Sequence, residues 1–170
     1  MPQNRFLFLL FLIVLPCLTY FLHECTHWLV YRFYGIDARL DLNTISLPQE
    51  IGLTSTQQFI IYGSGVFFSL IQGIIGYFIA LRKDIFIGSS LLLSAAVFRW
   101  AAILQGIVSS SDEIKMSQAM GVYDSVWPLI ISGSFFMMLF YVYKKGRLEM
   151  KFICGISLIF LLITYLYSLI

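Results

Sequence analysis

Apolar residues gather in five long runs that are separated by short polar segments. The runs extend over residues 6–34, 59–81, 85–108, 126–143 and 152–170. A helix needs about 18 to 20 apolar residues to cross about 30 Å of hydrocarbon, and each run approaches or exceeds that length. Pro128 near the start of the fourth run shortens its helical part. The pattern therefore predicts an all-α integral membrane protein with about five transmembrane helices.

Composition and charge agree with this class. Of the 170 residues, 59% are hydrophobic and 12% are charged, whereas soluble domains carry about a quarter charged residues. The net charge of +2 is too small to indicate nucleic-acid binding. We expect one polytopic membrane domain over residues 1–170, with the lipid bilayer as a partner and no nucleic acid. The oligomeric state does not follow from the sequence.

The basic residues lie at the ends of the apolar runs and indicate an orientation. With the N-terminus in the cytoplasm, seven basic residues fall inside and three fall outside, as the positive-inside rule requires. The inner group is Arg5, Arg82, Lys83, Lys144, Lys145, Arg147 and Lys151, and the outer group is Arg32, Arg39 and Lys115. We therefore expect a multi-pass protein of the cell membrane with a cytoplasmic N-terminus.

The segment between the first two runs has its own pattern. Gly35 is suited to end a helix, and the letters ARLDL at residues 38–42 alternate apolar and polar as in a half-buried strand. This predicts a short strand or hairpin after the first helix. The next helix is expected to begin near residues 54–56, where hydroxyl side chains can cap it. Within it, small residues recur every four positions and predict close helix packing, at Gly65, Ser69 and Gly73.

The chain's two histidines lie in the first apolar run, in the stretch HECTH at residues 23–27. His23 and His27 are four positions apart, so both imidazoles share one helix face and can reach one metal ion. Glu24 projects about 100° away, close enough to contact a water on that metal. This is the H-E-x-x-H pattern of metallopeptidases, with two zinc ligands and a general base.

The alternative interpretation is that these histidines only form hydrogen bonds across helices. A charged residue inside a spanning helix costs on the order of 2.5 to 3.5 kcal/mol. Three ionisable residues within one helical turn are therefore expected to act together, and binding of one shared Zn²⁺ ion would explain all three.

A catalytic zinc needs a third protein ligand. Because no further histidine exists, that ligand must be a carboxylate or, less favourably, a cysteine. The first and third helices run in the same direction, so the segment GIVSSSDEIKMSQAMG at residues 106–121 lies at the membrane face of the histidines. Asp112 or Glu113 can reach the metal if the helix ends at Gly106 or in the serines, although SSSDE also suits a helix N-terminus. Asp124 is the reserve candidate, and three more acids lie on the same face, Asp37, Asp41 and Glu50.

Together these residues resemble the site-2 protease family of intramembrane zinc metallopeptidases. The resemblance rests on FLHECTHWLVYRFYGI, residues 21–36, and on a later aspartate at the end of another helix. It implies that His23, His27 and Asp112 bind zinc and that Glu24 is the catalytic base. The family's G-P-x-x-N element corresponds to GVFFS at residues 65–69, with Ser69 in place of the asparagine. The catalytic core would then be helices one to three, residues 6–121.

The expected function is that of a membrane-embedded zinc metalloendopeptidase, which hydrolyses peptide bonds of membrane-associated protein substrates. Its partner would be a membrane protein or peptide substrate in extended form, held by β-addition to a strand within residues 38–47. The alternative is a non-catalytic metal-binding scaffold or transport component. Arg99, the remaining charge inside an apolar run, would either steady a carboxylate or the developing oxyanion, or pair or snorkel along the bundle.

Overall fold

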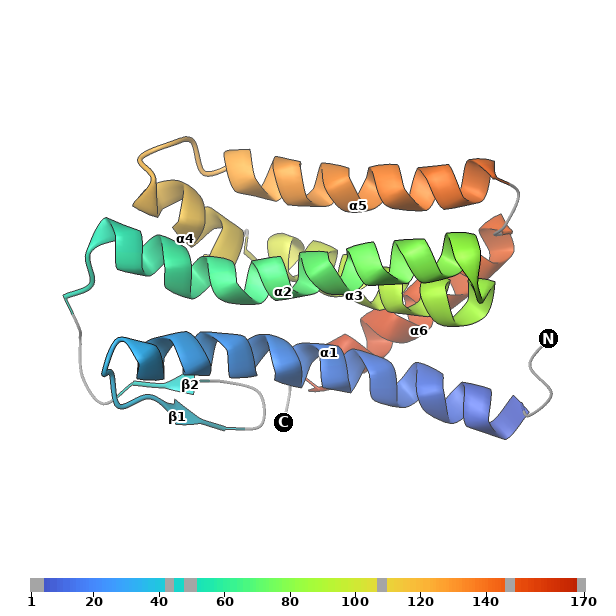
Figure 1. Ribbon diagram of the computed structural model, residues 1–170, viewed down its shortest axis with the longest axis horizontal. Coiled ribbons are helices and arrows are strands. Elements are labelled where there is room, and N and C mark those ends of the chain that lie inside the picture. Colours follow the sequence, from blue (N-terminus) through green and yellow to red (C-terminus); the bar gives the residue numbers. More distant parts are fainter. Residues whose placement is uncertain (1–4, 42–44, 48–51, 107–109, 146–148, 168–170) are drawn as a thin grey trace.

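The chain is described by a computed structural model, which covers residues 5–41, 45–47, 52–106, 110–145 and 149–167. Over these residues it forms six helices and one two-stranded antiparallel hairpin (Figure 1). The elements are α1 Arg5–Phe33, β1 Arg39–Leu40, β2 Ile45–Ser46, α2 Ser55–Arg82, α3 Ile85–Gln105, α4 Asp112–Ala119, α5 Val126–Lys144 and α6 Met150–Tyr167. The predicted helical class and the short β segment after the first helix are confirmed.

Among the described residues, three helices are long and apolar enough to cross a membrane, namely α2, α3 and α5. The helices α1 and α6 occupy the first and fifth apolar runs, and their crossing of the membrane stays a prediction. The helix α4 is an addition to the five expected helices. With the sequence DEIKMSQA it is too short and too polar to span, and it connects α3 to α5.

Local signals in the sequence explain the helix ends. The side chain of Thr54 accepts a hydrogen bond from the backbone N–H of Gln57, and the Gln57 side chain accepts one from the Thr54 N–H, so α2 begins with a capping box. After α1, Gly35 has a φ of 74°, a conformation that glycine adopts without strain. The helix α3 ends at Gln105, directly before Gly106, which is one of the two end points considered from the sequence.

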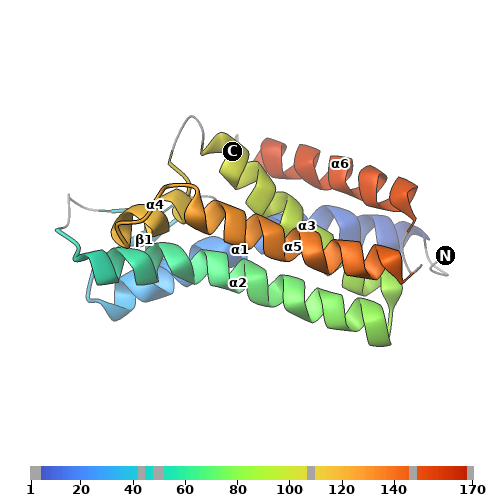
Figure 2. The same ribbon diagram turned by 90° about the horizontal axis from the view of Figure 1, so that it is seen from above.

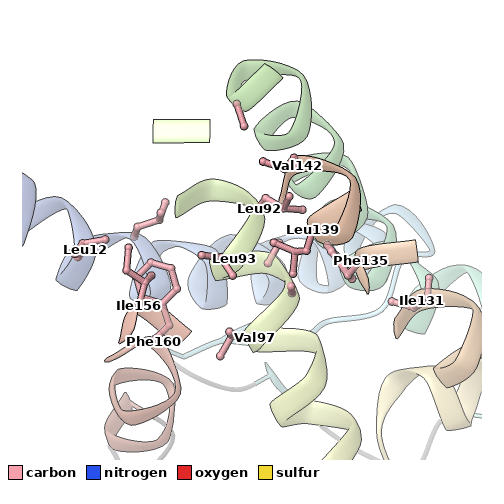
Figure 3. Close-up of a cluster of buried hydrophobic side chains, with 14 of the residues drawn as sticks. Leu12, Leu92, Leu93, Val97, Ile131, Phe135, Leu139, Val142, Ile156 and Phe160 are labelled. Atoms are coloured by element: carbon pink, nitrogen blue, oxygen red, sulfur yellow. The ribbon is translucent and has the colours of Figure 1, made fainter. Parts of the chain in front are cut away.

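The helix α3 lies at the centre of the bundle and packs closely against α2. A Cβ at Gly88 would lie 2.1 Å from the backbone nitrogen of Ala80, so α2 and α3 touch through their backbones there. Figure 3 shows the apolar core that forms around this pair, with buried side chains from α1, α3, α5 and α6. They include Leu12, Leu93, Phe135 and Phe160.

A polar contact fixes α1 against this core, one helical turn before His23. The hydroxyl groups of Thr19 and Ser94 lie 2.9 Å apart, and the Gln72 amide donates to the Thr19 Oγ1 at 3.0 Å. These side chains come from α1, α3 and α2, and such interhelical hydrogen bonds set the depth of helices in a bundle. They hold the histidine-bearing turn of α1 in place.

The hairpin and α4 lie at one end of the bundle, and the N-terminus lies at the other (Figures 1 and 2). The indole N–H of Trp28 donates to the Ala38 carbonyl at 3.0 Å, which fastens the start of the hairpin to α1. Ala38 also packs with Tyr31 and Ile61 in a small apolar cluster. One side of the C-terminal half of α1 is thus covered by α2 and the hairpin, while Leu29 and Phe33 of the same half stay exposed.

Candidate metal centre

The two histidines are buried and face α2. His23 is 1% exposed and His27 is 5% exposed. Gly65 of α2 leaves the space for them, because a Cβ there would lie 2.3 Å from His23 Cε1 and 2.5 Å from His27 Nε2. The small residues of α2 that were predicted to pack closely therefore contact different partners. Gly65 lies against the imidazoles, whereas Gly73 lies against Phe135 of α5.

Contacts with neighbouring elements orient both rings. The Nδ1–H of His27 donates to the Ile61 carbonyl at 2.6 Å, with the Ser64 hydroxyl 3.1 Å away. In the neutral ring this leaves a lone pair on Nε2, the arrangement that a metal-binding histidine needs. His23 lies edge-on to the Phe98 ring at 5.0 Å, and its Nδ1 has no hydrogen-bond partner among the described residues.

Asp112, the first residue of α4, completes the group. Its Oδ2 lies 3.0 Å from His23 Nε2 and 3.2 Å from His27 Nε2, and the two nitrogens are 3.0 Å apart. Burial disfavours the charged carboxylate, but when His27 is protonated its charge and the hydrogen bonds to both histidines hold the pKa of Asp112 well below its usual range. Neutral imidazoles leave the Nε2 lone pairs for a metal. The structure thus brings together the three residues expected to bind metal.

The chemistry and spacing of these atoms fit a zinc ion. Two imidazole nitrogens and one carboxylate oxygen, all electron-pair donors, converge on one point, and this is the one such group found in the described parts of the chain. Zinc bonds of about 2.1 Å in tetrahedral geometry place ligand atoms about 3.4 Å apart. The observed separations of 3.0 to 3.2 Å lie within a few tenths of an ångström of that value.

The other acidic candidates are engaged elsewhere. Glu113 is fully buried and pairs with Arg99 at 3.1 Å, and Asp124 is exposed and accepts from the Gln118 amide at 3.4 Å. Two acids near the hairpin contact neighbouring side chains, Asp37 with Arg32 and Asp41 with Ser46. Glu50 lies outside the described residues. Asp112 is therefore the carboxylate that the fold presents to the histidines.

Glu24 lies beside the group and borders two cavities. One, of about 220 Å³, lies between α1, α3 and α6 and is lined by residues that include His23, Arg99 and Asp112. The other, of about 170 Å³, lies towards the hairpin and is lined by His27, Tyr31, Ile45, Tyr62 and Asp112 in addition to Glu24. A larger cavity of about 680 Å³ near the C-terminal end of α5 has no carboxylate or imidazole in its lining. Both of the smaller cavities are lined by Glu24 and Asp112.

Three features of α2 that contact the histidines could not be identified from the sequence. They are the Ile61 carbonyl, the Ser64 hydroxyl and the space at Gly65, all on the N-terminal half of α2. The four-residue spacing of small residues did mark Gly65 as a contact position. The identity of the group it contacts depends on the rotation of α2 against α1, which no local pattern specifies.

Comparison with protein-family models, with curated proteins and with solved structures found no match to this chain. The interpretation of the site therefore depends on its own residues and geometry. The likeness to the site-2 protease family stays a prediction.

Proposed function

We propose that this chain is a membrane-embedded zinc metalloendopeptidase. The observation that carries the proposal is the convergence of His23, His27 and Asp112 within 3.2 Å, with Glu24 next to them on two cavities. A metal site for structure alone is closed by four protein ligands, whereas a catalytic zinc has three and an open position. The three ligands and the adjoining carboxylate match the second case.

In the proposed mechanism the chain supplies binding, orientation and proton transfer. A bound zinc ion would supply Lewis-acid chemistry, acidifying water and polarising the scissile carbonyl. The Glu24 carboxylate accepts the proton of the attacking water and delivers it to the leaving amine. The Ile61 carbonyl keeps His27 in the tautomer that binds metal through Nε2.

The hairpin is the proposed substrate clamp. Ile45 of β2 lines the same cavity as Glu24 and Asp112, so a peptide that pairs with the hairpin would pass the catalytic carboxylate. Residues 42–44, within the strand region considered from the sequence, lie outside the described residues. The substrate class is accordingly a membrane-associated protein or peptide in extended conformation.

The proposed setting is the cell membrane, with the N-terminus in the cytoplasm. The C-terminal ends of α2 and α5 carry Arg82, Lys83, Lys144 and Lys145. They lie at the end of the bundle where the chain begins, away from α4 and the hairpin (Figure 1). By the positive-inside rule that end is cytoplasmic, and the metal centre then faces the outer side.

The test uses the detergent-purified chain and the variants Glu24→Gln, His27→Ala and Asp124→Asn. Zinc content and hydrolysis of a quenched-fluorescent peptide library are measured in parallel. We expect one zinc per chain and hydrolysis in the wild type, zinc without hydrolysis in Glu24→Gln, neither in His27→Ala, and both in Asp124→Asn. Zinc retained with no hydrolysis by the wild type would favour the metal-binding scaffold or transport component instead.

A further inference from the structure

A buried ion pair lies directly behind the candidate metal centre. The guanidinium of Arg99 in α3 donates to Glu113 Oε1 in α4 at 3.1 Å, and its Nη1 lies 3.7 Å from Asp112 Oδ2. The side chains are 1% and 0% exposed, so both charges are removed from solvent. The ring of Phe98, which also contacts His23, lies 4.4 Å from the guanidinium carbon.

Stability does not account for this pair. Replacing a buried ion pair by neutral residues is often without cost to stability or even stabilising, because both charges must be desolvated. Charges retained within a helical membrane bundle generally mark a functional site. The location of the pair suggests that it orients Asp112, because Glu113 directly follows Asp112 in the first turn of α4.

Consecutive residues on a helix project about 100° apart, so the direction of one determines that of the other. Anchoring Glu113 on α3 sets the rotation of α4 and directs Asp112 towards the histidines of α1. The N-cap residue Ser111 makes no side-chain capping hydrogen bond, so the cap does not provide this orientation. The guanidinium adds a second constraint, because it approaches the same Asp112 oxygen that contacts both imidazoles.

We propose that Arg99 and Glu113 are positioning residues, which hold the Asp112 carboxylate in the geometry of a metal ligand. The inference rests on the proposed function, because it requires the metal centre. Neither residue takes part in the proton transfers assigned to Glu24. Groups that orient a metal ligand typically account for 10- to 100-fold in metal affinity.

The experiment compares Arg99→Lys, Glu113→Gln and the double variant Arg99→Gln/Glu113→Gln, each in the full detergent-purified chain. The double variant removes one positive and one negative charge together, so a change in its metal affinity reports geometry and not net charge. Arg32→Lys is the matched control, because it makes the same substitution in an exposed ion pair, with Asp37. The readouts are the zinc dissociation constant by chelator competition, the visible spectrum of bound Co²⁺, and the metal-free melting temperature.

We expect zinc binding to weaken 10- to 100-fold in all three variants, with an altered Co²⁺ spectrum, and to be unchanged in Arg32→Lys. Glu113→Gln leaves the buried guanidinium with only its longer contact to Asp112, at 3.7 Å, and is the variant most prone to misfold. If it does misfold, the charge-balanced double variant decides. A folded double variant with wild-type zinc affinity and Co²⁺ spectrum would overturn the positioning role and leave the metal centre intact. A wild-type chain that binds neither ion would overturn the metal centre, and this inference with it.

Discussion

Gly65→Ala tests the packing of the histidines against α2 most directly. The added methyl group would lie 2.3 Å from His23 Cε1 and 2.5 Å from both His23 Nδ1 and His27 Nε2. Ordinary contacts between such atoms are about 3.5 Å, so the rings or α2 must move by about 1 Å. Metal-site geometry tolerates about 0.5 Å, and a zinc–nitrogen bond is only about 2 Å long.

We therefore expect Gly65→Ala to weaken zinc binding by about 100-fold, the upper end of the range for a disturbed supporting group. Overpacking of this kind costs on the order of 1 to 3 kcal/mol of stability, so the chain should still fold. Zinc affinity is measured by chelator competition, and the melting temperature is recorded on the metal-free protein.

The matched control is Gly133→Ala in α5, where an added Cβ meets nothing within 4 Å. This substitution should leave zinc binding unchanged and stabilise the helix by about 0.5 to 1 kcal/mol. If Gly65→Ala bound zinc as tightly as Gly133→Ala, the histidines could not be packed on α2 in the way described. The metal would then have to be held in another arrangement.

Three further outcomes follow from the site. Asp112→Asn should lose zinc because the amide is a poor ligand, whereas Asp124→Asn should keep it, as metal analysis of both proteins would show. Zinc at 100 times its dissociation constant should stabilise the wild type by about 2.7 kcal/mol in thermal unfolding and leave His27→Ala unaffected. Leu40→Pro, which disturbs the β1 residue paired with Ile45, should keep zinc but abolish peptide hydrolysis, and intact hydrolysis would exclude the hairpin as the clamp.

The elements of this fold that the sequence predicts well are those set by local chemistry. The start of α2 depends on a hydroxyl cap within residues 54–56, and the structure has that boundary as expected. The end of α3 at Gly106 is one of the two places considered, the other being the serines that follow. The pair His23 and His27 shares a face by helix geometry alone, so it too could be recognised. In each case the deciding interaction lies within one or two helical turns.

The third metal ligand, in contrast, could not be chosen from local sequence alone. Asp112 and Glu113 are adjacent acids in the same short helix, and composition or spacing cannot separate them. Their roles depend on the contact of Glu113 with Arg99, fourteen positions earlier on another helix. The same limit applies to Gly65, whose neighbours are imidazoles some forty positions away. Tertiary contacts of this range lie beyond any local pattern.

Charge balance gives an independent reason to expect a divalent cation here. Around the histidines the structure places three carboxylates, Glu24, Asp112 and Glu113, and one guanidinium, Arg99. With neutral imidazoles and ionised carboxylates this group has a formal charge of −2, and three of its side chains are largely removed from solvent. Such a charge is costly to bury unless it is compensated, and a divalent ion would compensate it together with the Lys115 ammonium, which also acts on Glu24. The Arg99–Glu113 pair is neutral by itself, so the uncompensated charge resides on Asp112, the proposed ligand, and on Glu24, the proposed base.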